Sequence, residues 1–207
     1  LYHAHKHPNT IKALCLFVPA FSVSRWAHVL PHLLPKRKMI KCPNKPHTST
    51  YHTYPISSVK AISQLVRANN KAIESGVNLP CFIAAVREDI TVKIEKILTF
   101  WKHNSHRKSH FYFYSDKTEK IRGKRVTLVN SRKLGKNILN MSHVAVPLSP
   151  KDEHYGVNGS NYKKPTAELL LGESTPKNIL KPGFDRLRYN PDWTGMTAAL
   201  KGFLVAL

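Results

Sequence analysis

The sequence has no apolar run that approaches the roughly 20 residues of a membrane-spanning helix, so it predicts no transmembrane segment. It has only three cysteines, Cys15, Cys42 and Cys81. Cys15 and Cys81 lie in apolar runs, where a free cysteine usually behaves as a small buried hydrophobe. We therefore expect both to be buried and the protein to belong to a reducing, cytoplasmic compartment. Because Leu1 is not a methionine and no signal-peptide pattern follows it, we expect the chain to begin within a longer protein.

Motifs for nucleotide, zinc or RNA binding are also missing from the sequence. No P-loop, zinc-finger or RNA-recognition pattern occurs. His3, His5 and His7 alternate, but neither a cysteine nor a carboxylate joins them in a ligand spacing. We therefore expect no metal site and no other cofactor.

Acidic residues are scarce relative to basic ones. The chain has 12 Asp and Glu against 33 Lys and Arg, which gives a net charge of +21. Such a balance favours contact with polyanions or acidic membrane surfaces. The basic residues are nevertheless dispersed along the chain, which is equally typical of a solvated basic surface. The charge therefore predicts nonspecific polyanion contact and no specific recognition of nucleic acid.

Apolar runs that predict buried strands alternate with segments of helical periodicity. We expect strands at 11–19, 80–86, 110–115, 125–129 and 138–141, and helices at 57–75, 91–103 and 193–207. The first strand is a nearly continuous apolar run, which is typical of a strand buried on both faces. Ser57 or Ser58 is expected to cap the first of these helices and Gly76 to end it. Because strands that alternate with helices form a mostly parallel sheet with helices on its faces, the pattern predicts an α/β fold.

Two proline-rich stretches interrupt this pattern. Residues 22–56 carry five prolines and little periodicity, which indicates an irregular, lid-like insertion. Residues 146–192 are expected to be mainly loops. No repeat or clean boundary divides the chain, so we expect residues 1–207 to form a single incomplete domain.

Two catalytic-type residues each follow an apolar run. Asp89 comes after the run 80–86, within Val86-Arg87-Glu88-Asp89-Ile90-Thr91-Val92. His143 comes after the run 137–141, within Asn140-Met141-Ser142-His143-Val144. An acid followed by a histidine at strand ends is the order of the last two members of a Ser-Asp-His triad on an α/β sheet. We expect both side chains to meet at one edge of the sheet.

These segments resemble the C-terminal portion of the α/β-hydrolase family, specifically its carboxylesterase- and lysophospholipase-like serine hydrolases. Other stretches also resemble members of this family, namely Ile11 to Ala20, Ser149 to Gly156 and Arg186 to Pro191. The resemblance implies a mostly parallel sheet with flanking helices. It also implies that Asp89 is the acid of the triad and that His143 is its general base.

The nucleophile that the resemblance implies is not in the chain. Its G-x-S-x-G elbow is expected a few residues upstream of Leu1, and the oxyanion hole would lie upstream with it. A partial substitute, Gly172-Glu173-Ser174-Thr175-Pro176, ends in proline where the motif has glycine. Ser174 is therefore a weak alternative nucleophile, and its simpler interpretation is a serine in a loop.

Asp89 and His143 each have a simpler interpretation. Asp89 is well placed to cap the helix expected from residue 91, and a histidine beside a strand is often structural. Glu88 and Asp152 are alternative acids. The leading hypothesis is the C-terminal part of a serine hydrolase that acts on small-molecule or lipid carboxylic esters and is inactive without the upstream serine. The second hypothesis is a noncatalytic, strongly basic polyanion-binding protein on a degenerate hydrolase scaffold.

Overall fold

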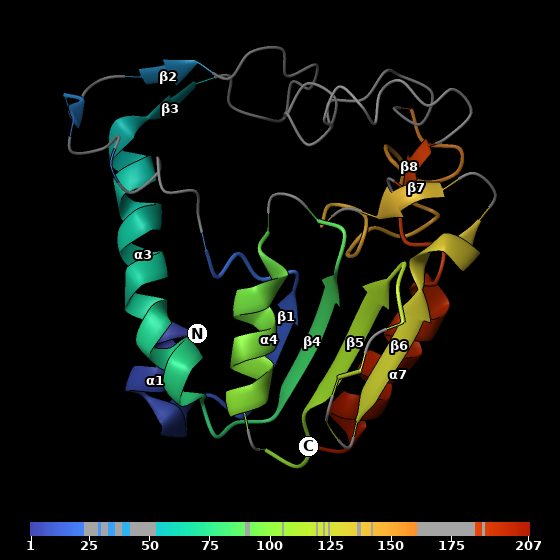
Figure 1. The fold of residues 1–207 in the computed structure, drawn as a ribbon, viewed down its shortest axis with the longest axis horizontal. Helices are drawn as coiled ribbons and strands as arrows, with labels where there is room; N and C mark the ends of the chain where they lie inside the picture. The colour runs from blue at the N-terminus through green and yellow to red at the C-terminus, as the bar shows by residue number, and fades with distance from the viewer. Residues whose placement is uncertain are drawn as a thin grey trace.

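A computed structural model describes most of the chain, and the fold is built around one parallel sheet. The described residues are 1–22, 29, 33–35, 39–41, 53–89, 92–104, 106–118, 120–121, 123, 125–135, 138–141, 143–160, 185–187 and 189–207. The sheet has four strands in the order β1-β4-β5-β6, and every pairing is parallel (Figure 1). Its strands are β1 (Leu14–Phe17), β4 (Cys81–Val86), β5 (His110–Ser115) and β6 (Val126–Asn130). The predicted α/β fold is confirmed.

Helices flank this sheet, and smaller elements surround it. The longer helices are α3 (Ile56–Ser75), α4 (Ile94–His103) and α7 (Trp193–Val205). The shorter elements are α1 (Tyr2–Lys6), the 3-10 turns η1 (Pro8–Thr10) and η2 (Ser131–Leu134), the antiparallel pair β2 (Met39–Lys41) and β3 (Thr53–Pro55), and the parallel pair β7 (Ile138–Met141) and β8 (Asp185–Leu187). Among the described helices, none combines the length and apolar character needed to cross a bilayer.

The alternation of side chains along the strands places α4 and α7 on opposite faces of the sheet. Phe82 of β4 lies 5.9 Å from Phe203 of α7 between ring centroids. Phe111 of β5, which is paired in register with Ile83, lies 5.2 Å from Trp101 of α4. Because successive strand residues point to opposite faces, both faces of the central strands are covered. All six residues of β4 are accordingly buried.

Two expectations about the first strand and first long helix were wrong. β1 is half-buried and Cys15 is exposed, because among the described strands β1 pairs only with β4 and so lies at an edge. Neither Ser57 nor Ser58 caps α3, which begins at Ile56 directly after Pro55 and has no side-chain cap. Because the fixed φ of Pro55 suits the start of a helix, α3 begins earlier in the chain than expected. Gly76 ends α3 as predicted, with φ 73°, and a Cβ there would lie 2.3 Å from the carbonyl oxygen of His103.

The strand before His143 also differs from the expectation. β7 pairs with β8 in a separate two-stranded sheet and not with β6. η2 follows β6 immediately, and this turn takes the chain away from the edge of the main sheet. Figure 1 shows β7 and β8 beyond the carboxyl ends of β5 and β6. His143 therefore reaches the edge of the main sheet from outside it.

Several expectations lie mostly or wholly outside the described residues. Most of the lid-like insertion 22–56 is among them, although β2, β3 and the start of α3 are described. The alternative nucleophile Ser174 is outside them as well. The single-domain assignment of residues 1–207 stays a prediction.

Truncating the centre of the sheet should destabilise the fold far more than the same change on a helix surface. Ile83 is fully buried in β4, whereas Ile62 of α3 is 53% exposed. Ile83→Ala leaves a cavity between β4 and α4 and should lower the free energy of unfolding by about 2–5 kcal/mol. The matched control Ile62→Ala should change it by less than about 0.5 kcal/mol. Urea denaturation of both variants checks this, and equal losses would contradict the observed placement of the core.

Candidate functional site

The first part of the site is the turn that follows β4. The backbone N–H of Arg87 donates to the carbonyl oxygen of Tyr114 at 2.9 Å, which continues the ladder between β4 and β5 past the last residue of β4. The chain then leaves the sheet through Glu88 and Asp89. Since β4 and β5 are parallel and buried, this turn is held at the carboxyl edge of the sheet, where ligand sites of open α/β sheets are found.

Asp89 and His143, which are 54 residues apart in the sequence, meet at this edge. Asp89 Oδ2 lies 2.7 Å from His143 Nδ1 and also accepts a hydrogen bond from the backbone N–H of His143. Asp89 Oδ1 accepts a third bond, from the backbone N–H of Val92 at 2.7 Å. The side chain of Asp89 is 1% exposed and that of His143 is 28% exposed. The acid is thus enclosed while part of the imidazole reaches the surface.

The surroundings of Asp89 favour its ionised form. Burial alone raises the pKa of its carboxyl group, but the hydrogen bonds and charge of His143 and the bond from Val92 lower it more. The net result is a pKa below the ordinary value of 3.8. A carboxylate at this position accepts a hydrogen bond from a protonated Nδ1. We therefore assign the lone pair of the neutral imidazole to Nε2.

The loop that carries His143 is held by a buried asparagine. Asn190, which is completely buried, donates from Nδ2 to the Tyr114 hydroxyl at 2.7 Å and to the Val146 carbonyl oxygen at 3.2 Å. Its backbone N–H donates to the carbonyl oxygen of Leu148 at 2.8 Å. Asn190 therefore connects the loop after His143 to β5. The run 186–191 is one of the stretches in which the sequence resembles the α/β-hydrolase family, but no local pattern indicated that Asn190 would hold this loop.

A second tie links β5 to the start of α7. The hydroxyl of Tyr112 donates to Asp192 Oδ2 at 2.6 Å, and that of Tyr114 reaches the same oxygen at 3.4 Å. Burial and the nearby Asp192 raise the pKa of the Tyr112 hydroxyl, so it acts here as a donor. Gly195 allows the close approach, because a Cβ there would lie 2.4 Å from Asp192 Oδ1.

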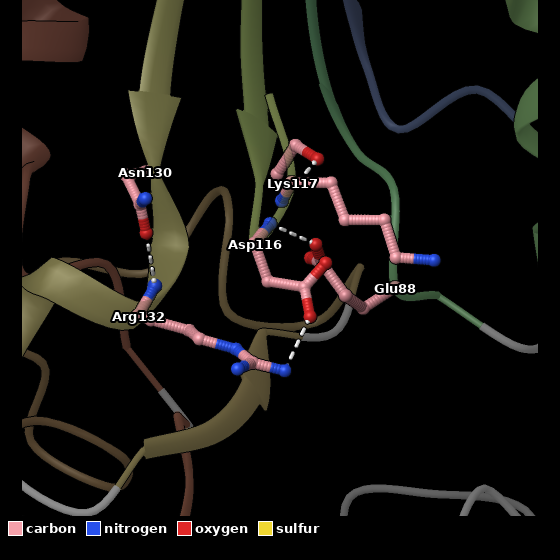
Figure 2. Close-up of polar contacts among 6 residues, drawn as sticks. Glu88, Asp116, Lys117, Asn130 and Arg132 are labelled. Atoms are coloured by element: carbon pink, nitrogen blue, oxygen red, sulfur yellow. Dashed lines mark hydrogen bonds and ion pairs between the residues drawn. The ribbon is translucent and has the colours of Figure 1, made fainter. Parts of the chain in front are cut away.

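The alternative acids are used elsewhere. Glu88 Oε1 accepts a hydrogen bond from the backbone N–H of Asp116, just past the end of β5, as Figure 2 shows. Asp152 accepts bonds from the backbone N–H groups of His154 and Tyr155 and so orders its own turn. Asp89 is thus the one of the three for which a bond to His143 is found.

Asp89 does not cap a helix in the strict sense. α4 begins at Ile94 with Lys93 at its N-cap, and no side chain caps it. The bond from Val92 instead closes the turn between β4 and α4. This bond to Asp89 Oδ1 orients the carboxylate so that Oδ2 faces His143. The turn after β4 therefore positions the Asp89–His143 pair.

Other candidate binding sites lie apart from this pair. In the part of the chain that the structure describes, no group of three or more His, Cys, Asp or Glu side chains could hold a metal ion. An open depression is lined by His110 at the start of β5, by Thr127 of β6 and the preceding Arg125, and by α7. It lies toward the opposite edge of the sheet from Asp89, so it is not part of this site.

The pairing of Asp89 should make stability depend on pH. Because the pKa of Asp89 is lower in the folded than in the unfolded chain, its contribution is present above about pH 4 and is lost as the pH falls through the folded value. Asp89→Asn should therefore cost roughly 1–3 kcal/mol at pH 7 and progressively less below pH 4. Urea denaturation across this pH range measures the difference. The same chemical change at an exposed acid, Glu95→Gln, should change the free energy of unfolding at pH 7 by less than about 0.5 kcal/mol. A gap for Asp89→Asn that stays constant across this pH range would refute the interpretation.

Comparison with known proteins adds no assignment to this geometry. No family model matches the chain, and no curated protein matches it. The molecule is therefore identified by its architecture, an α/β fold with a four-stranded, all-parallel sheet and flanking helices.

Proposed function

We propose that this chain is the C-terminal part of a serine hydrolase that acts on carboxylic esters, with Asp89 and His143 as two members of its triad. The observation that carries the proposal is the 2.7 Å contact between a buried carboxylate and a partly exposed imidazole at the carboxyl edge of a parallel sheet. The proposal places the serine upstream of Leu1, as the resemblance to carboxylesterases and lysophospholipases implies.

In this proposal His143 acts as the general base and then as the general acid. Nε2 takes the proton from the serine hydroxyl as its oxygen attacks the ester carbonyl carbon. The same nitrogen then returns the proton to the alcohol that leaves. A water molecule, deprotonated by Nε2, hydrolyses the acyl-enzyme in the second half of the cycle.

Asp89 supports these steps through its two hydrogen bonds to His143. The bond to Nδ1 keeps the lone pair on Nε2, and the negative charge stabilises the imidazolium that forms in each transition state. The hydrogen bond from the backbone N–H of His143 to Asp89 also fixes the backbone position from which the imidazole side chain extends. Because Asp89 is 1% exposed, water competes little with these bonds.

The substrate class follows from the same resemblance. We expect a small-molecule or lipid ester with an apolar acyl group, lysophospholipids among them. Both oxyanion-hole donors of such an enzyme come from segments upstream of the described site. The 207 residues alone therefore supply proton transfer but neither attack nor oxyanion stabilisation.

The 207-residue chain should not turn over p-nitrophenyl esters, whereas a version extended upstream through the serine should. In the extended protein, Asp89→Asn should lower kcat by roughly 10⁴-fold, and His143→Gln, which removes the general base, by about 10⁶-fold. Glu95→Gln, an exposed acid on α4, is the matched control and should leave kcat unchanged. Saturable hydrolysis by the 207 residues that is abolished by Ser174→Ala would overturn the proposal.

The second candidate function is nonspecific binding of polyanions, favoured by the net charge of +21. Binding of this kind releases counterions, so affinity for duplex DNA of arbitrary sequence should fall about 10³-fold or more between 50 and 200 mM salt. Fluorescence anisotropy at several salt concentrations measures the slope. Absent or salt-independent binding would remove this candidate.

A further inference from the structure

Two carboxyl groups next to the proposed triad remain without a role in the steps above. Glu88 directly precedes Asp89 after β4, and Asp116 directly follows β5. Figure 2 shows the two side chains facing each other at the carboxyl edge of the sheet. Glu88 Oε1 accepts a hydrogen bond from the backbone N–H of Asp116. The turn that carries Asp89 is therefore tied to the end of the neighbouring strand.

The remaining oxygens of this pair are unevenly satisfied. Asp116 Oδ2 accepts from Arg132 Nη2 at 2.8 Å, which secures one side of that carboxylate. Glu88 Oε2 and Asp116 Oδ1 are both buried, and neither has a hydrogen-bond partner among the described residues. Two buried acceptors without a donor are costly, and a proton between two facing carboxyl groups removes that cost.

We propose that Glu88 is a positioning residue for Asp89, and that it holds the Asp89 turn against β5 through a single proton shared with Asp116. The neutral carboxyl group of Glu88 accepts from the backbone of Asp116 and donates to its side chain. This two-point contact fixes the residue directly before Asp89. The inference rests on the proposed function for its chemical meaning, but the contact itself does not depend on catalysis.

The charges around the pair agree with one shared proton. Arg132, from η2, forms an ion pair with Asp116 Oδ2 at 2.8 Å. Lys117 follows Asp116, and in Figure 2 its ammonium group is directed away from the two carboxyl groups. On the turn itself, Arg87 precedes Glu88 and the ionised Asp89 follows it, with His143 bonded to Asp89. Because Arg132 is committed to Asp116, a negative charge on Glu88 beside the carboxyl groups of Asp89 and Asp116 is unfavourable.

The pKa of Glu88 is raised, which agrees with this contact. Burial first, and then the neighbouring Asp116, raise the pKa of Glu88 to about 7. The proton is therefore kept below about pH 7 in the folded chain, whereas the unfolded chain loses it near the ordinary value of 4.5. The stabilisation is complete below 4.5 and is lost as the pH rises through about 7. The Asp89 turn should loosen over the same range.

NMR titration of the 207-residue chain tests the inference. The side-chain carboxyl carbon of Glu88 should titrate near pH 7, and the backbone amide signals of Val92 and Asp116 should shift with the same midpoint. Glu88→Gln keeps an acceptor and adds a permanent donor toward Asp116, so both amide signals should lose this inflection. His143→Gln should retain the inflection, which separates the titration of Glu88 from that of the imidazole.

Two further variants complete the test. The control Glu95→Gln makes the same chemical change on the exposed side of α4 and should leave both amide titrations unchanged. Asp116→Asn removes the neighbouring charge and supplies a donor, so the midpoint of Glu88 should fall toward 4.5. A Glu88 carboxyl that titrates near 4.5 in the unchanged protein, or an inflection that survives in Glu88→Gln, would overturn the inference. Unfolding of Glu88→Gln, seen by circular dichroism, would overturn it too, because glutamine preserves both contacts.

Failure of this inference can be told apart from failure of the proposed function. The His143 Nδ1 proton should give a strongly downfield signal in the unchanged protein because it is bonded to Asp89. If that signal is missing, the proposed triad fails. If the signal is present and Glu88→Gln leaves the amide titrations as they were, only the role of Glu88 fails.

Discussion

Parallel pairing of β4 with β5 is the constraint on which the rest of this structure depends. It holds β4, whose six residues are all buried, inside the sheet and brings the ends of both strands to one edge. Arg87 extends the ladder past the strand, so the position of the turn after it is set by backbone hydrogen bonds. Asp89 is held in place as a consequence, and its low exposure follows from the depth of that turn. A carboxylate placed in this way can be enclosed and still remain ionised, because three donors face it.

The histidine is supplied by a different route. His143 leaves a two-stranded sheet that does not pair with the main one, and buried Asn190 holds its loop to Tyr114 of β5. β5 thus takes part in positioning both members of the pair, through its ladder with β4 and through its tyrosine hydroxyls. The proposed catalytic geometry therefore depends on contacts with β5 more than on the Asp89 turn or the His143 loop alone.

The sequence predicted the features that depend on a single segment of chain. It did not predict the features that depend on which segments lie side by side in the fold. The apolar runs predicted β4 and β5 closely, and the acid-then-histidine order led to two residues that the structure places in contact. Cys15 was expected to be buried and is exposed, because its run lies at an edge of the described sheet. Asp116 was not singled out at all, since its contact with Glu88 depends on which strand lies beside β4.

The sequence by itself determined the α/β class and the order in which Asp89 and His143 leave their strands, because both follow from periodicity along one stretch of chain. Only the tertiary structure decided which acid contacts the histidine. Glu88 and Asp89 are adjacent and chemically alike, yet the turn after β4 directs one toward the end of β5 and the other toward His143. That choice depends on contacts between segments far apart in the chain, and a local pattern contains no information about them.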